Sequence, residues 1–155
     1  MDIRLAEEKD LPAIYELGFD SYSAEVVATY GSVVDKDKCR KIAETMVKNK
    51  TVFLAISERN IIGAMLGIFT NSGFDSEVIY NSMFFFMKTE YRKFTKQFIN
   101  DVENLLKLTT ATRFIIGNPE FNNGPEMDRF YSIMGFKKLE THYIKPIIKE
   151  VKDER

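Results

Sequence analysis

Two residue types that stabilise secreted proteins or bind metal ions are nearly missing from this sequence. Its 155 residues include one cysteine, Cys39, and one histidine, His142. A lone cysteine cannot form an internal disulfide, which favours a reducing compartment. A lone histidine without Cys, Asp or Glu at ligand spacing does not make a metal site, so a structural role is the better interpretation of His142.

Long apolar runs and a surplus of one charge are also missing. No stretch approaches the roughly 18 apolar residues of a membrane span, and the first residues lack the apolar run of a signal peptide. The 22 lysines and arginines nearly balance the 23 aspartates and glutamates. Nucleic-acid-binding proteins usually carry a basic surplus. We therefore expect a cytoplasmic protein without a membrane or nucleic-acid partner.

The composition is sufficient for one folded domain. Hydrophobic residues make up 45% of the chain and aromatic residues 13%, which provides a sizeable core. The length favours a single domain, and no repeat or linker interrupts it. We expect one domain over residues 1–148 and a charged tail over residues 149–155.

Local patterns predict alternating strands and helices. Alternating or continuous apolar runs predict strands over residues 3–5, 51–56, 61–69, 78–87, 113–116 and 136–147. Apolar residues at spacings of three and four predict helices after Asp10 and over residues 35–50, 94–106 and 127–134. Asp10 is the predicted N-cap of the first helix, and Gly135 the residue that ends the last one. The order β-α-α-β-β-β-α-β-α-β predicts an α/β or α+β class with a mixed sheet flanked by helices.

Two segments resemble the GNAT superfamily of N-acetyltransferases. The segment Phe130–Phe136 has the form F-Y-x-x-x-G-F, and Thr89–Arg92 lies between a long strand and an amphipathic helix. The resemblance extends in element order over nearly the whole chain. It implies a GNAT-like fold with a mostly antiparallel sheet, acetyl-CoA as co-substrate, and a primary amine of a small molecule or protein as acceptor. The resemblance is also compatible with a homodimer.

The resemblance implies donor-binding residues at three places. The backbone of Phe85, Phe86 and Met87 matches the strand edge that binds the pantetheine arm, whose amides can pair with an open edge. The start of the next helix matches the site of the pyrophosphate. Asn123 matches an asparagine that contacts the donor before the last helix. The residues at the pyrophosphate position are Arg92, Lys93, Thr95, Lys96 and Gln97.

The pyrophosphate segment departs from the family pattern, R-x-x-G-x-G or G-x-A. Thr95 and Gln97 occupy the glycine positions, where glycine would let the phosphates approach the backbone. The first apolar residue, Phe94, follows Arg92 sooner than expected, so either the loop is short or Phe94 points elsewhere. Cationic side chains and the Thr95 hydroxyl compensate in part.

Tyr131 matches the tyrosine that often serves the family as general acid. A phenol with a pKa of about 10 is protonated at neutral pH and can protonate the departing thiolate. The alternative is a tyrosine that only packs in the core. The general base stays open between Glu77, at the start of the long strand, and Glu25, after the first helix.

A second interpretation comes from a different class of protein. The substitutions at Thr95 and Gln97 favour a GNAT-like fold that has lost donor binding and acts as an interaction or structural protein. The segment Gly135–Tyr143 also resembles bacteriophage-encoded members of the superfamily.

Overall fold

The computed structural model describes residues 1–18, 31, 33–117 and 124–139. A first helix covers residues 11–18. The other elements are β1 (Asp2–Leu5), η1 (Glu8–Asp10), α2 (Lys36–Lys48), β2 (Val52–Ser57), β3 (Asn60–Asn71), β4 (Val78–Met87), η2 (Thr89–Phe94), α3 (Thr95–Leu106), β5 (Arg113–Ile116) and α4 (Gly124–Ile133). The predicted order is confirmed up to α4. Of the predicted last strand, residues 136–139 are in neither helix nor strand, and the rest lies outside the described residues.

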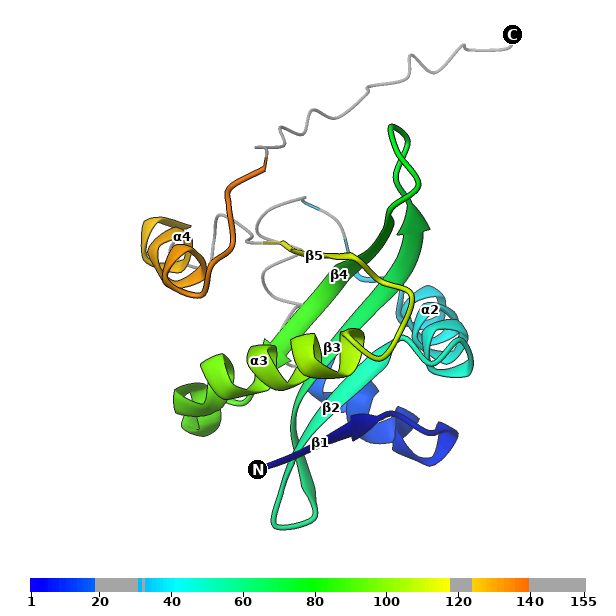
Figure 1. Ribbon diagram of the computed structural model, residues 1–155. Helices are drawn as coiled ribbons and strands as arrows, with labels where there is room; N and C mark the ends of the chain where they lie inside the picture. Colours follow the sequence, from blue (N-terminus) through cyan, green and yellow to red (C-terminus); the bar gives the residue numbers. More distant parts are fainter. Residues whose placement is uncertain (19–30, 32, 118–123, 140–155) are drawn as a thin grey trace, which may run out of the picture.

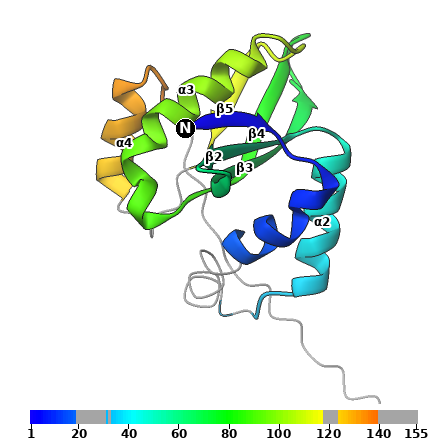
Figure 2. The same cartoon turned by 90° about the horizontal axis from the view of Figure 1, so that it is seen from below.

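The strands form one sheet in the order β1-β2-β3-β4-β5. The first three pairings are antiparallel, and β4 and β5 are parallel. The predicted mixed, mostly antiparallel sheet is therefore confirmed. Helices α3 and α4 cover one face, and the first helix and α2 cover the other (Figures 1 and 2).

Each face of the sheet has its own hydrophobic core, because successive side chains of a strand point to opposite faces. Ile14 and Leu17 of the first helix pack with α2 on one face. On the other face, α3 contributes its buried stripe, which comprises Phe98, Ile99, Val102 and Leu106. The spacing of that stripe is the helical period that the sequence predicts.

The predicted N-cap role of Asp10 is wrong. Asp10 ends η1, the short 3₁₀ turn that precedes the first helix. Its carboxylate accepts hydrogen bonds from the Arg4 guanidinium at 2.6 and 2.8 Å and from the Glu7 backbone N–H at 2.8 Å. The hydrogen bond from Arg4 holds the pKa of Asp10 below its usual range. Asp10 therefore fastens β1 to the turn that starts the first helix.

The C-terminus of α4 is a Schellman motif centred on Gly135. Gly135 has a φ of 90° and donates its N–H to the Ser132 carbonyl, while Phe136 donates to the Tyr131 carbonyl, both at 3.0 Å. The predicted role of Gly135 is confirmed. The motif also explains the spacing Tyr-x-x-x-Gly-Phe, because the Phe136 ring packs back on Tyr131 with centroids 5.8 Å apart.

Helix α2 ends in the same pattern with a lysine at the glycine position. Lys50 has a φ of 57° and donates to the Val47 carbonyl, and Thr51 donates to the Met46 carbonyl, both at 3.0 Å. A side chain is unfavourable in this conformation. We expect Lys50→Gly to raise the free energy of unfolding by about 0.5–1 kcal/mol, measured by urea denaturation. Lys48→Gly, inside the last turn, should instead lower it by about 1 kcal/mol. A loss of stability in Lys50→Gly would contradict this account.

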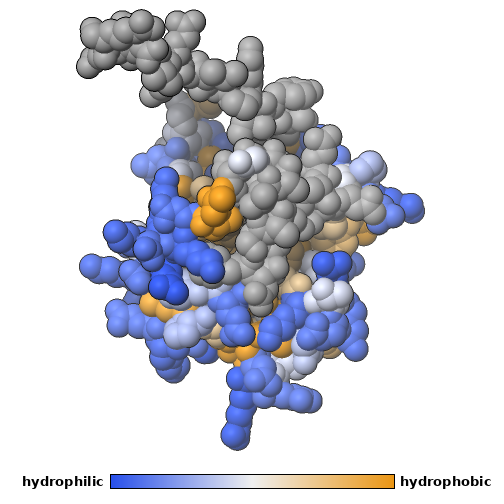
Figure 3. Space-filling model, turned by 180° about the vertical axis from the view of Figure 1, so that it is seen from behind, coloured by the Kyte–Doolittle hydropathy of each residue, from blue (hydrophilic) through white to orange (hydrophobic). Residues whose placement is uncertain are grey.

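The described part of the surface is largely polar on the side opposite to the view of Figure 1. Figure 3 shows hydrophilic residues over most of the described surface there, with small hydrophobic patches between them. None of the helices in the described ranges is long and apolar enough to cross a membrane.

Candidate functional site

Strands β4 and β5 run together over only part of β4. Strand β5 pairs with Ile79–Ser82, the first half of β4. From Phe84 to Met87, the only described strand that pairs with β4 is β3, on its other side. The second half of β4 therefore presents an edge toward the side from which β5 has departed.

A β-bulge marks the point of departure. Leu66 of β3 lies opposite Phe84, and Gly67 lies opposite Ser82, so Met83 is the extra residue. Gly67 is needed here, because a Cβ atom would lie 2.5 Å from the Tyr80 ring and 2.7 Å from the Asn81 carbonyl oxygen. The bulge shifts the alternation of β4 by one residue.

The direction of the β4 backbone groups follows from one hydrogen bond. Lys88 donates its N–H to the Ile62 carbonyl of β3 at 2.8 Å. Backbone groups of an antiparallel strand alternate between its two edges, so those of Phe86 also point to β3. Those of Phe85 and Met87 point to the edge that β5 leaves. Two of the three predicted pantetheine residues thus direct their backbones to this edge, whereas the Phe86 side chain packs on the face of the first helix.

The predicted pyrophosphate segment is helical throughout. The 3₁₀ helix η2 leads directly into α3, with the Tyr91 N–H donated to the Lys88 carbonyl at 2.9 Å and the Thr95 N–H to the Arg92 carbonyl. No side chain caps the start of α3, and its first turn has no acidic residue. Because the Thr95 donor is already in a hydrogen bond, the segment differs from a glycine loop with backbone donors directed at a ligand.

The packing of Phe94 decides between the two explanations for its early position. Phe94 stacks on Tyr91, with ring centroids 6.5 Å apart, and the Lys93 ammonium lies 5.1 Å from its ring centroid. The first fully buried residue of α3 is Phe98. Phe94 therefore points elsewhere, and the buried stripe of α3 begins one turn later.

Exposed cations surround the start of α3. They are Lys88, Arg92, Lys93 and Lys96, and Gln97 beside them is also exposed, whereas Thr95 is half-buried. Among the residues that the structure describes, none of the four cations has a carboxylate within ion-pair distance. Cations at a helix N-terminus oppose the helix dipole. The arrangement favours an anionic ligand over a structural salt bridge.

Tyr131 lies in α4, on the α3 face of the sheet. Its side chain is buried in the hydrophobic cluster to which Phe85 and Met87 also belong. Rings connect it to β5, because Phe136 lies between Tyr131 and Phe114 with its centroid 5.4 Å from that of Phe114. The structure thus brings the predicted general acid into the same layer as the predicted pantetheine edge.

Of the remaining predicted residues, Glu77 lies just before the start of β4, and the others lie outside the described residues. Glu77 precedes β4 in the turn that joins it to β3, where its N–H donates to Asp75 and its carbonyl accepts from Ser72. The bulge residue Met83 is six positions further along the sequence, which corresponds to roughly 20 Å of extended chain. Asn123, like Glu25 and His142, lies outside the described residues. No group of described residues could hold a metal ion.

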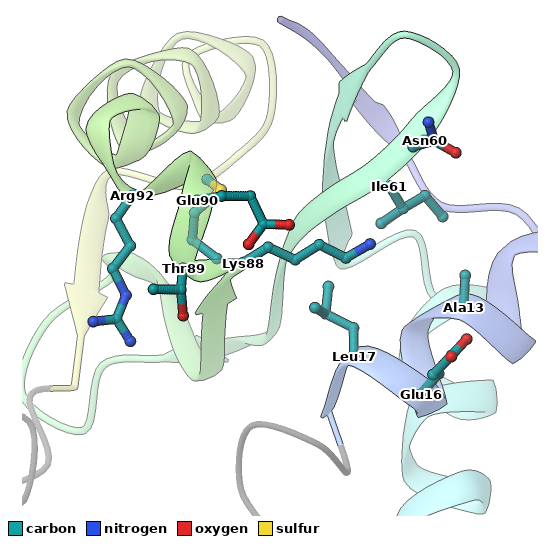
Figure 4. Close-up of a pocket in the computed structure, with 10 residues that line it drawn as sticks. Ala13, Glu16, Leu17, Asn60, Ile61, Lys88, Thr89, Glu90 and Arg92 are labelled. Carbon is teal, nitrogen blue, oxygen red and sulfur yellow. The ribbon is translucent and has the colours of Figure 1, made fainter.

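A pocket of about 650 Å³ opens beside the end of β4. Its lining comes from the first helix (Ala13, Glu16, Leu17), the start of β3 (Asn60, Ile61) and the end of β4 with η2 (Met87, Lys88, Thr89, Glu90, Arg92). Figure 4 shows Lys88 reaching across the pocket toward the first helix, while Arg92 lies at the opposite margin, beyond Thr89. Sequence reasoning missed Glu16, Lys88 and Glu90, because they come from separate segments and form no motif.

Comparison with solved structures supports the expected fold. A possible acetyltransferase from Clostridium difficile 630 is 12% identical, with a TM-score of 0.73, and the match covers 96% of this chain and 98% of that one. A GNAT family acetyltransferase from Staphylococcus aureus is 15% identical, with a TM-score of 0.67 and coverage of 94% and 98%. An aminoglycoside 6′-N-acetyltransferase from Acinetobacter haemolyticus is also 15% identical, with a TM-score of 0.69 and coverage of 96% and 100%.

These similarities establish that the chain has the fold of GNAT acetyltransferases. Neither a family model nor a curated protein matches the sequence. The three structures are bacterial proteins by name and give no support to a bacteriophage origin.

Proposed function

We propose that the protein is an N-acetyltransferase that moves the acetyl group of acetyl-CoA to a primary amine. The observation that carries the proposal is the departure of β5 from β4 beside the bulge, with the backbone groups of Phe85 and Met87 directed to that edge. A strand edge is the feature that binds an extended, amide-containing ligand. The pantetheine arm of acetyl-CoA is such a ligand.

In this mechanism, the amine nitrogen attacks the thioester carbonyl, one C–N bond forms and one C–S bond breaks. Backbone N–H groups of β4 polarise the carbonyl oxygen. The Tyr131 hydroxyl gives its proton to the departing thiolate and recovers one from solvent, while the amine loses its proton to a base. Glu77 and Glu25 stay predictions for that base. The donor supplies the activated acyl group, and the protein supplies proximity and orientation.

Side-chain cations hold the donor phosphates in this proposal, with Arg92 at their centre. We expect Arg92→Ala to weaken acetyl-CoA binding by about 1–2 kcal/mol, or about 5- to 30-fold. The difference should shrink as salt is added, because exposed charges are screened. Lys41→Ala, on the far side of the molecule in α2, removes the same charge and should leave the affinity unchanged. Equal affinities of wild type and Arg92→Ala would remove Arg92 from the site.

One observation favours the second interpretation, a GNAT fold without donor binding. The Thr95 N–H is donated to the Arg92 carbonyl within a continuous helical segment, so this donor is directed into the helix. Such a protein would act through interactions with partners. Its fold would be retained while the phosphate site is lost.

Release of free CoA thiol tests the proposed function directly. The wild type is incubated with acetyl-CoA and a panel of primary amines, which includes an aminoglycoside because one structural neighbour is an aminoglycoside 6′-N-acetyltransferase, and a lysine-containing peptide. We expect amine-dependent thiol release that Tyr131→Phe nearly abolishes. Absence of release with every amine would favour the second interpretation. The cytoplasmic location and the homodimer stay predictions.

A further inference from the structure

The side chain of Met83 is exposed in the middle of a strand that is otherwise well covered. Half of its surface (50%) is accessible, whereas Ser82 just before it and Phe86 just beyond the bulge are buried. Ser82 is also the last residue of β4 that pairs with β5. Met83 therefore lies where the two strands separate, and its accessible side chain borders space that a ligand can occupy.

The β-bulge places the Met83 side chain on the face of the sheet that carries the first helix. Tyr80 belongs to the hydrophobic cluster on the α3 side, and the alternation of a strand puts Ser82 on the same side. Met83 therefore points to the opposite side. Phe84 packs against the cluster of the first helix as well, as expected where a bulge redirects the side chains. Met83 and Tyr131 thus belong to opposite faces of the sheet.

The first helix contacts β4 at a different level from Met83. Its last residue, Gly18, lies beside Phe86, since a Cβ atom on Gly18 would lie 3.5 Å from the Phe86 ring. Three residues of strand, roughly 10 Å, separate Phe86 from Met83. Met83 is exposed because the first helix ends against a later part of β4.

The proposed donor brings its thioester to this level of β4. The cations proposed for the phosphates follow the end of the strand, and the edge proposed for the pantetheine arm runs back from Met87 toward the bulge. Phosphates and thioester are at opposite ends of that arm. Tyr131 also lies toward the bulge, since its ring contacts Phe136, which contacts Phe114, which contacts Tyr80, at centroid distances of 5.8, 5.4 and 5.7 Å.

The planar thioester group then determines where its acyl chain points. In the proposed mechanism, the carbonyl oxygen is directed at N–H groups of the β4 edge, and the sulfur at the face of Tyr131. The third substituent of a trigonal carbon lies away from both, which is toward the face of the first helix. Met83 is exposed on that face, beside the bulge.

We propose that Met83 contacts the acyl group of the bound donor and restricts the donor to a short acyl chain such as acetyl. This role rests on the proposed donor site and is independent of the amine acceptor. A methionine side chain is long and unbranched, so it fills space that a longer acyl chain needs. Alanine in its place removes every side-chain atom beyond Cβ and leaves room for a butyryl chain.

Titration calorimetry with CoA, acetyl-CoA and butyryl-CoA tests this role. We expect the wild type to bind acetyl-CoA about tenfold or more tightly than butyryl-CoA. Met83→Ala should reduce this difference to within about twofold and leave CoA binding unchanged. Met83→Leu has a similar volume and should keep the preference. Leu108→Ala, at an exposed leucine after α3, is the matched control and should change none of the affinities.

Release of CoA thiol by the same samples separates this role from the proposed function. A preference lost in Met83→Ala, in a protein that acetylates no amine, would support the role of Met83 and contradict the enzyme. An active Met83→Ala variant that keeps the wild-type preference would contradict the role alone, as would equal binding of both thioesters to the wild type. Absence of binding of all three CoA compounds would contradict the donor site and the role of Met83 together.

Discussion

Tyr131→Phe is expected to slow acetyl transfer by about 100- to 10,000-fold, with little change in acetyl-CoA affinity or melting temperature. The substitution keeps the ring, whose centroid lies 5.5 Å from that of Phe130 and 5.8 Å from that of Phe136. It removes only the hydroxyl, which in the proposed function protonates the departing thiolate. Single-turnover acetylation and the melting temperature are measured on the same sample, because spared binding distinguishes a catalytic from a structural role.

Tyr80→Phe is the matched control in the same hydrophobic cluster. Tyr80 is fully buried, donates its hydroxyl to the Thr51 carbonyl at 2.9 Å, and has its pKa raised by burial. Loss of this hydrogen bond should lower the free energy of unfolding by about 1 kcal/mol and leave the transfer rate unchanged. If Tyr131→Phe behaves like Tyr80→Phe, with lower stability and normal transfer, Tyr131 is a core residue and not the general acid.

Val102→Asp should lower the free energy of unfolding by about 3–5 kcal/mol. Val102 is fully buried against the sheet, between Phe98 and Leu106 on the same stripe of α3. A carboxylate there has no partner and is removed from water. Because domains are stable by only about 5–15 kcal/mol, a substantial shift of the urea midpoint is expected.

The control for Val102→Asp is Asn100→Asp on the same helix. Asn100 is exposed, so the new charge stays in water and the urea midpoint should move little. A Val102→Asp variant that unfolds at the wild-type midpoint would show that the buried stripe of α3 is misassigned.

The hydrophobic pattern of the sequence was sufficient to predict those elements whose position is determined by burial. The ends of β4 and β5 match the predicted ranges, because continuous apolar runs leave no alternative to a buried strand. Helix α4 begins at Gly124, whereas the sequence pattern predicts a start at Met127. The prediction is late because the first turn of the helix is polar and has no apolar residues at helical spacing. Pro125 is compatible with a first helical turn. The start of this helix was therefore not visible in the hydrophobic pattern.

The pyrophosphate segment shows how spacing alone misleads. Phe94 stands four residues before Phe98 and fits the buried stripe by number, yet it stacks on Tyr91 outside the core. A local aromatic partner offers an apolar side chain another place to pack. The sequence is compatible with both explanations for the position of Phe94, a short loop or a side chain that points elsewhere. No feature of the sequence distinguishes between them.

The candidate site divides into a part with a motif and a part without one. Tyr131, Gly135 and Phe136 could be found because helix-end geometry fixes their spacing. The bulge at Met83 could not be predicted from the sequence, since one extra residue within a run of apolar residues does not alter the composition. Glu16, Lys88 and Glu90 are exposed polar residues, and only the folded chain places them around one pocket.

Calorimetric titration of the wild-type protein with acetyl-CoA tests the central claim most directly. The departure of β5 from β4 and the cations at the start of α3 are interpreted as a donor site. The account predicts saturable heat with a dissociation constant in the micromolar range, and weaker binding as salt is added. Absence of heat up to millimolar acetyl-CoA would contradict the donor site and leave a GNAT fold that serves another purpose.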